Sequence, residues 1–130
     1  RVDYNVPFKE NKILDNNKIK CSLTTIKFLL KQNCKIVLMT HFGRPKGKIV
    51  PALKLNKISK ELKKLLPKQK ITKLNDCIGE DIKIKIMKGK AKQIFLLENL
   101  RFYSEEEEND YLSSTVVKEA AEASSKSSRS

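Results

Sequence analysis

The sequence contains no tryptophan, and aromatic residues make up only 6% of its 130 residues. Proteins that bind single-stranded nucleic acid stack bases on aromatic rings, and here no aromatic residues alternate with the basic ones. No apolar run approaches the roughly 18–20 residues that a membrane span requires, and no basic stretch followed by an apolar one resembles a signal peptide. We therefore expect neither a nucleic acid nor a membrane as the partner of this chain.

Cysteine and histidine are also scarce. Cys21, Cys34 and Cys77 lie far apart in the sequence, and the single histidine, His41, cannot complete a zinc site with them. We expect no metal site, and reduced, mostly buried thiols in a reducing, cytoplasmic compartment. Glycine occurs only four times, and neither the phosphate-binding patterns GxxxxGKS/T and GxGxxG nor the zinc-binding pattern HExxH is present.

What the sequence has in excess is positive charge: 28 Lys and Arg against 15 Asp and Glu give a net charge of +13. Such an excess favours polyanionic partners, so a basic nucleic-acid-binding domain is one hypothesis. Most of this charge is lysine, however. In KISKELKKLL (57–66) and DIKIKIMKGKAK (81–92) the lysines fall at helical spacing between apolar residues. This pattern is typical of solvated helix faces, which is the interpretation that we prefer.

Apolar residues recur with two different periods along the chain. Short continuous or alternating apolar runs predict strands, whereas apolar residues three or four positions apart predict amphipathic helices. Asn16 and Asn17 are N-cap candidates for the first helix, and Pro67 ends the second. In chain order, the expected elements are the end of a strand at 1–6, a helix at 18–33, a strand at 35–40, a helix at 54–66, a strand at 70–74, a helix at 79–88, a strand at 93–99 and a helix start at Ser104.

Strands that alternate with amphipathic helices predict an α/β fold, in which a parallel sheet carries helices on both faces. The composition changes near Leu112, because Ser supplies seven of the eighteen residues 113–130 but only three of the first 112. We expect residues 113–130 to form a frayed helix and a flexible tail, or a segment foreign to the fold, and we assign them no function.

Conspicuous polar residues directly follow the predicted strands. The carboxyl ends of parallel strands share one edge of a sheet, and ligands of open α/β sheets bind along that edge. The residues that should meet there are Asp3 and Asn5 after the first strand, His41 and Arg44 after the second, and Glu98, Asn99 and Arg101 after the last.

Two arginines and a histidine suit an anion, because guanidinium forks bind phosphate or carboxylate through paired hydrogen bonds. Two alternatives remain open. In the first, Arg44 and Arg101 only pair with Asp3 or Glu98 and tie loops together. In the second, His41 is an ordinary capping residue. The residues by themselves therefore predict an anion-binding edge of unspecified chemistry.

Five segments resemble the N-terminal, substrate-binding domain of phosphoglycerate kinase in their order and spacing. They are RVDYNVP (1–7), DNNKIKCSLTTIKFLL (15–30), LMTHFGRPKG (38–47), LNDCIGEDI (74–82) and LLENLRFYSEEEEND (96–110). The most specific motifs are RVDxNVP, HxGRP and LLENLRF. The similarity covers about residues 1–111, so we assign residues 1–112 to a partial N-terminal domain and expect the C-terminal nucleotide-binding domain to be absent.

The resemblance implies a Rossmann-like, three-layer αβα domain with a parallel sheet, forming part of one lobe of a two-lobe kinase. The family transfers a phosphoryl group between 1,3-bisphosphoglycerate and Mg-ADP, which gives 3-phosphoglycerate and ATP in glycolysis. Mg-ATP or Mg-ADP is then the cofactor of the complete enzyme, and we expect none to be bound by this segment. In related enzymes the residues that match Arg44 and Arg101 hold the 3-phosphate. Those that match Asp3, Asn5 and His41 surround the hydroxyl and carboxylate of the substrate.

The sequence departs from the family at Lys18, in NNKIK (16–20), where the family has an arginine that stabilises the migrating phosphoryl group. Lysine keeps the charge but loses the planar fork, so we expect weaker transition-state stabilisation from Lys18 as a catalytic and substrate-binding residue. The alternative is that Lys18 is a surface residue. We expect a monomer that is inactive on its own. A stand-alone module for small phosphorylated anions remains the other alternative, besides the nucleic-acid-binding domain.

Overall fold

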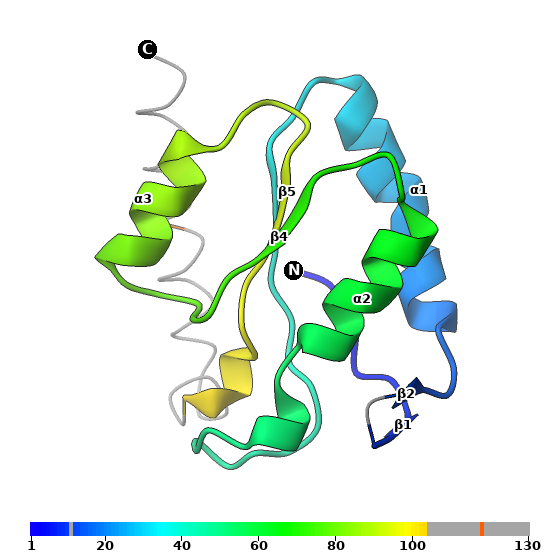
Figure 1. Cartoon of the computed structure of the whole chain (residues 1–130), viewed down its shortest axis with the longest axis vertical. Coiled ribbons are helices and arrows are strands. Elements are labelled where there is room, and N and C mark those ends of the chain that lie inside the picture. The colour runs from blue at the N-terminus through cyan, green and yellow to red at the C-terminus, as the bar shows by residue number, and fades with distance from the viewer. Residues whose placement is uncertain (11, 104–117, 119–130) are drawn as a thin grey trace.

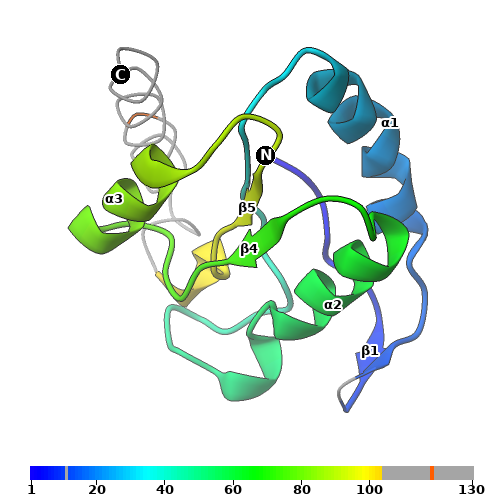
Figure 2. The same cartoon turned by 45° about the horizontal axis from the view of Figure 1, so that its top comes forward.

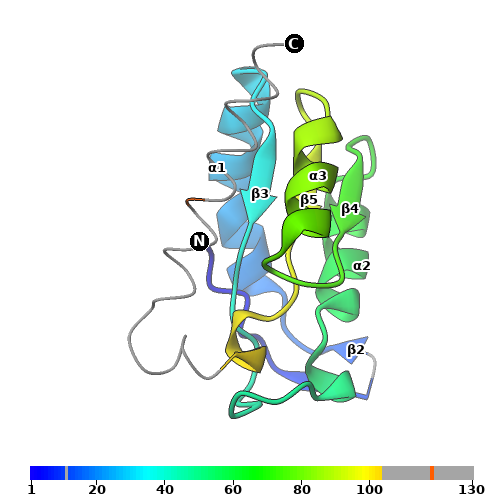
Figure 3. The same cartoon turned by 90° about the vertical axis from the view of Figure 1, so that its left-hand side faces the viewer.

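The larger of the two sheets in the described part of the chain has three parallel strands. The computed structural model describes residues 1–10, 12–103 and 118. In this part of the chain, β3 (Ile36–Leu38) and β4 (Ile71–Lys73) both pair with β5 (Ile94–Leu96), which lies between them (Figure 3). Ile94 is in register with Ile36 on one side and with Ile71 on the other. All three strands therefore end at the same edge.

Three helices cover the two faces of this sheet (Figure 1). Helices α1 (Asn17–Lys31) and α2 (Asn56–Leu65) lie on one face, and α3 (Glu80–Lys88) lies on the other. This arrangement confirms the predicted α/β fold with a parallel sheet between helical layers. Within the described residues, no helix has both the length and the apolar character that a bilayer span requires.

Two apolar clusters hold the layers together, one on each face of the sheet. The larger cluster joins α1 and α2 to the sheet residues that point toward them, and the smaller one joins α3 to the residues of the opposite face. Neighbouring residues of β5 show the alternation that a strand imposes, because Ile94 and Leu96 enter the first cluster whereas Phe95 enters the second. Since both faces are covered, β5 is apolar at each of its three positions.

The helices and the strands β3, β4 and β5 lie where the sequence pattern predicts them, but the N-terminus differs. Residues 1–6 form no strand. The Val2 N–H donates to the Met39 carbonyl at 3.0 Å, but the next inward-facing donor, the Tyr4 N–H, bonds to the Thr40 hydroxyl instead of a backbone carbonyl. The ladder therefore stops after one bond. The prediction that residues 1–6 contain the end of a strand is therefore wrong.

A short hairpin follows this segment and was not predicted. It consists of β1 (Phe8–Lys9) and β2 (Lys12–Ile13), which pair antiparallel and pack against α2 (Figure 2). Each strand has two residues, too few to create an alternating pattern. The helix start expected at Ser104 lies outside the described residues, and so does the expected tail at 113–130 apart from Lys118.

The three cysteines are free thiols, but they are not mostly buried as the sequence analysis expected. Cys77 is buried, Cys34 is partly buried and Cys21 is exposed. Cys21 lies on α1 two residues after Ile19, which is buried in the core. Two positions along a helix turn a side chain by roughly 200°, so Cys21 faces away from the sheet.

Candidate functional site

The N-terminal segment is fixed to the carboxyl edge of the sheet by Tyr4. Its ring is completely buried, its hydroxyl lies 2.6 Å from the Ser22 hydroxyl on α1, and its N–H donates to Thr40 just past β3. In extended backbone, alternate side chains point to opposite sides. Because Tyr4 points inward, Asp3 and Asn5 point outward and are exposed beside the end of β3.

Asp3, Asn5 and Lys18 form one contact cluster at this edge. The Lys18 ammonium lies 3.1 Å from the Asp3 carboxylate and donates to the Asn5 carbonyl at 3.1 Å. The Asp3 carboxylate also accepts from the Asn5 N–H at 3.1 Å. Partial burial opposes ionisation of Asp3, but the Asn5 N–H and the Lys18 charge outweigh it and hold the pKa of Asp3 below its usual value. Asp3 is therefore the negative member of this cluster, Lys18 is the positive one and Asn5 is neutral.

His41 and Arg101 each present a buried nitrogen without a partner. Among the described residues, His41 Nδ1 and Arg101 Nε are buried and make no hydrogen bond. Burial lowers the pKa of His41 and the Arg101 charge lowers it further, while Asp3 opposes both and Arg1 and Lys18 add to the lowering. The imidazole is thus held neutral amid positive charge. The buried Arg101 Nε–H is a donor without an acceptor, which costs free energy that an anion at this point would recover.

Arg44 lies in the loop after β3, and its side chain is exposed. In the described part of the chain it has no hydrogen bond or ion pair, so no contact joins it to the other predicted site residues. Its backbone is nevertheless fixed on both sides. The Gly43 N–H donates to the Asn5 amide oxygen at 2.9 Å, and Pro45 is buried. Gly43 has φ +65°, and a Cβ there would lie 2.6 Å from Leu53, so only glycine fits.

The two alternatives left open by the sequence can now be decided for the described residues. The Asp3 carboxylate pairs with Lys18, and the Glu98 carboxylate pairs with Lys73 on β4. Neither carboxylate forms an ion pair with Arg44 or Arg101. The imidazole of His41 caps no backbone group, since its Nδ1 is without a partner. The arginines and the histidine therefore remain available to a ligand.

Arg1 was missed by the sequence analysis. It lowers the pKa of His41 and therefore lies within electrostatic reach of the imidazole. Arg1, Asp3 and Asn5 occupy alternate positions of an extended segment and are all exposed. This period of two was the signal that could have added Arg1 to the cluster.

Glu98 and Asn99 lie behind this surface and are buried. One Glu98 oxygen accepts from the N–H groups of Leu55 and Asn99 at 2.9 and 3.0 Å, and the other bonds to Lys73. The carboxylate thus joins β5 to β4 and to the residue that precedes α2. Both residues follow β5, as predicted, but their side chains bond within the protein.

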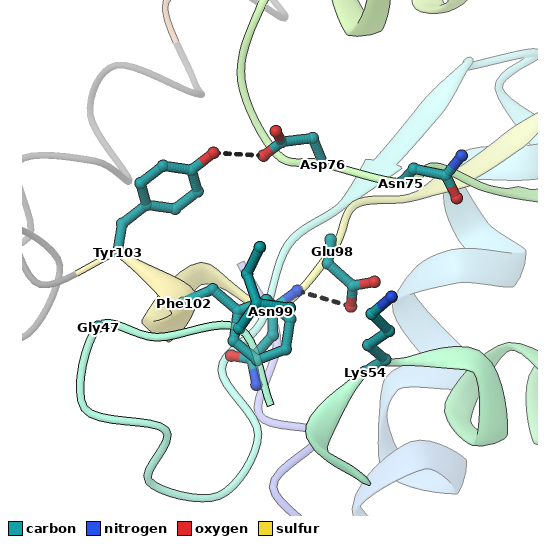
Figure 4. Close-up of a pocket in the computed structure, with 9 residues that line it drawn as sticks. Gly47, Lys54, Asn75, Asp76, Glu98, Asn99, Phe102 and Tyr103 are labelled. Atoms are coloured by element: carbon teal, nitrogen blue, oxygen red, sulfur yellow. Dashed lines mark hydrogen bonds between the residues drawn. The ribbon is translucent and has the colours of Figure 1, made fainter. Parts of the chain in front are cut away.

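A cavity of about 440 Å³ opens beside this surface, past the ends of β4 and β5 (Figure 4). Its wall includes Asp76, whose carboxylate accepts from the Tyr103 hydroxyl at 2.7 Å. None of the predicted site residues (Asp3, Asn5, Lys18, His41, Arg44 and Arg101) lines it. Four of them (Asp3, Asn5, Lys18 and Arg44) are exposed, and His41 and Arg101 are partly buried. Within the described residues, no three His, Cys, Asp or Glu side chains are grouped as metal ligands.

Comparison with known proteins gives a consistent result. The family model described as "Phosphoglycerate kinase" matches residues 1–125. Curated phosphoglycerate kinases of Moorella thermoacetica and Dictyoglomus turgidum are 44% and 47% identical over 110 residues, which cover 85% of this chain but 28% and 27% of those proteins. The crystal structure of the Pyrococcus horikoshii phosphoglycerate kinase matches with a TM-score of 0.69 at 33% identity, over 82% of this chain and 25% of that one. The chain thus spans about a quarter of the length of these relatives.

Proposed function

Since this chain belongs to the phosphoglycerate kinase family, we propose that the surface formed by Asp3, Asn5, Lys18, His41, Arg44 and Arg101 binds 3-phosphoglycerate and 1,3-bisphosphoglycerate. The observation that carries this proposal is the pair of buried, unpartnered nitrogens at His41 and Arg101. A phosphate or carboxylate oxygen supplies the acceptor that the Arg101 Nε–H lacks, and it accepts equally from His41 Nδ1 when this nitrogen carries a proton. Asp3, the one carboxylate in the cluster, can accept a hydrogen bond from the substrate hydroxyl.

The proposed reaction of the complete enzyme is transfer of a phosphoryl group between 1,3-bisphosphoglycerate and Mg-ADP. Such transfer depends on alignment of the reactants and on positive charge near the migrating group. In this chain, Arg44 and Arg101 would hold the 3-phosphate and Lys18 would face the migrating group. We propose that the Mg-nucleotide is bound by the part of the relatives that this chain does not cover.

The same proposal covers the activity of the isolated chain, its compartment, its oligomeric state and its pathway. We propose that these 130 residues bind the substrate but do not catalyse the reaction alone, because the nucleotide must be held opposite the substrate with water excluded. We further propose that the protein acts in the cytoplasm, as a monomer, in glycolysis.

Isothermal titration of the chain with 3-phosphoglycerate tests the binding function. We expect saturable one-to-one binding at physiological salt, and much weaker binding of glycerate, which lacks the phosphate. A short DNA duplex is the control for non-specific attraction to a chain of net charge +13, because such attraction falls steeply as salt rises. If the duplex bound as tightly as 3-phosphoglycerate at physiological salt, or if 3-phosphoglycerate did not bind, the proposal would be wrong.

The affinity for 3-phosphoglycerate should depend on pH through His41. Burial and neighbouring cations lower the pKa of His41 below its ordinary value of 6.5, so the imidazole of the free protein is neutral at pH 7. A bound anion favours the imidazolium form and raises that pKa. The protonated protein therefore binds the anion more tightly, and affinity should fall as pH rises from the free-state pKa to the bound-state pKa, about tenfold per unit at most.

The control for this titration is His41→Gln. The phosphate itself ionises with a pKa of about 6, and this ionisation affects the wild type and the variant equally. The ratio of the two affinities isolates His41, and it should decline as the pH rises from the free-state pKa, which lies below the ordinary 6.5, to the raised pKa of the bound state. A constant ratio over this range would mean that His41 does not change its protonation when the anion binds.

Lys18→Arg should raise kcat in a longer chain that includes the nucleotide lobe. A guanidinium can donate two parallel hydrogen bonds to a phosphoryl group, which a single ammonium cannot. The Lys18–Asp3 pair opposes this change only weakly, because its side chains are 50% and 61% exposed. We expect an increase of about ten- to a hundredfold, equivalent to ~1–3 kcal/mol. Lys20→Arg, an exposed change on the same helix, is the matched control. Equal rates for Lys18→Arg and the wild type would exclude Lys18 from the rate-determining contact.

A further inference from the structure

Asn99 is a buried amide whose hydrogen-bonding groups all contact loops of the carboxyl edge. Its side chain is 0% exposed. The amide oxygen accepts from the N–H groups of Phe42 and Arg101, both at 3.1 Å. The amide nitrogen donates to the carbonyls of Phe42 and Leu53, at 2.7 and 3.0 Å. Two donors and two acceptors are thereby satisfied by one side chain.

Three of these four bonds join the two segments that carry the candidate cations, and the fourth holds Leu53. Phe42 lies next to His41 and two residues before Arg44, and its N–H and carbonyl are both held by Asn99. Arg101 is held by the same amide oxygen through its own N–H. Further along, the Gly47 N–H donates to the Arg101 carbonyl at 3.2 Å. The loop 42–47 is therefore tied at both ends to the backbone around Arg101.

We propose that Asn99 is a positioning residue of the anion-binding surface, which sets the separation of His41 and Arg44 from Arg101. This inference rests on the proposed function, because it concerns the same ligand. Asn99 does not touch the ligand in this scheme, since its four hydrogen-bonding positions are occupied within the protein. It acts by holding the donors at a separation that one phosphorylated anion can bridge.

An amide is required at this position because Asn99 must donate and accept at the same time. An aspartate of the same shape would keep the acceptor for the N–H groups of Phe42 and Arg101, but it would set oxygen against the carbonyls of Phe42 and Leu53. The two carbonyls would lose their donor, and the loop would be released on that side. Displacement of a binding group by about 1 Å can cost up to about a hundredfold in a pre-organised site.

The test compares Asn99→Asp with Gln93→Glu. Gln93 is also a buried amide, 8% exposed, but it lies at the opposite end of β5. It donates to the Thr72 hydroxyl at 3.0 Å and accepts from the Lys90 N–H at 3.2 Å. Both changes convert a buried amide to an acid and should lower the thermal midpoint. Only Asn99→Asp should weaken 3-phosphoglycerate binding, by about ten- to a hundredfold, when measured by titration well below both midpoints.

A double-mutant cycle with Arg101→Ala distinguishes a positioning role of Asn99 from a purely structural one. If Asn99 acts by positioning Arg101, the loss caused by Asn99→Asp must shrink when Arg101 is already absent. Should Asn99→Asp fail to fold, Asn99→Ser, which is uncharged and retains one hydroxyl, takes its place in the same comparison.

The outcomes separate this inference from the proposed function. If the wild type binds 3-phosphoglycerate and the Asn99 variant binds it equally well, the inference is wrong but the proposed function stands. Equal weakening by Gln93→Glu, or additive effects of Asn99→Asp and Arg101→Ala, also overturns it. Absence of binding by the wild type overturns the proposed function, and the inference fails with it.

Discussion

Arg101→Ala is expected to weaken 3-phosphoglycerate binding by about a hundredfold, equivalent to ~3 kcal/mol. The reason lies in how Arg101 is held. Its N–H is fixed by Asn99 and its carbonyl by Gly47, and its buried Nε has no partner within the described residues. The backbone of Arg101 is thus fixed before the ligand arrives, so little backbone entropy is lost on binding. Alanine removes both the charge and the paired donors.

The measurement is the KM for each substrate in a chain that includes the nucleotide lobe. The KM for 3-phosphoglycerate should rise strongly while the KM for ATP, the co-substrate in that direction, changes little; ADP affinity should likewise stay nearly constant. Arg101→Lys, which keeps the charge but not the fork, should fall between wild type and alanine. Lys20→Ala controls for loss of one positive charge elsewhere. Equal loss of nucleotide affinity in Arg101→Ala would place Arg101 outside the substrate site.

Glu98→Ala is expected to lower the free energy of unfolding by about 3–5 kcal/mol. The Glu98 carboxylate pairs with Lys73, and the two side chains are only 6% and 11% exposed. Removing the acid leaves the ammonium without its partner in the interior, and it also leaves the N–H groups of Leu55 and Asn99 without an acceptor. A loss of this size is a large part of the about 5–15 kcal/mol that stabilises a typical domain.

Urea unfolding of the chain measures this effect, and a second change at Lys73 tests its cause. Lys73→Met in the Glu98→Ala background removes the uncompensated charge and should restore part of the lost stability. Glu80→Ala, at an exposed acid in the first turn of α3, should cost less than about 1 kcal/mol. A loss below about 1 kcal/mol for Glu98→Ala would show that the pair contributes little to folding.

The helices and the buried strands could be predicted because each imposes a period on the sequence. Leu55, just before α2, and Ile58 and Leu62 on α2 are all fully buried, as their spacing predicts. The N-terminal segment could not be predicted in the same way. It alternates like a strand, but its Tyr4 N–H bonds to a side chain, and nothing in a one-dimensional pattern distinguishes a hydroxyl acceptor from a backbone carbonyl.

The sequence predicts which residues meet at the carboxyl edge, but it does not predict their contacts. The rule that parallel strands end at one edge places Asp3, His41 and Arg101 together, and the electrostatic coupling of His41 to the other two agrees with it. The rule does not say which charges will pair. Lysines form ion pairs with the acids: Lys18 pairs with Asp3, and Lys73 pairs with Glu98. The contacts of Asn99 could not be predicted either, because bonds from one amide to backbone groups far away in the sequence follow no sequence pattern.

The strand order has a consequence for synthesis of this protein on the ribosome. Both outer strands, β3 and β4, pair only with β5, which is made last of the three. Until Leu96 has emerged, the nascent chain holds two strands that cannot join each other, and the apolar faces of α1 and α2 have no complete sheet to cover. Long-range pairing of this kind delays folding and prolongs exposure of apolar surface. Ribosome stalling before β5 should therefore leave the nascent chain open to proteases and chaperones, and release after it should protect the chain.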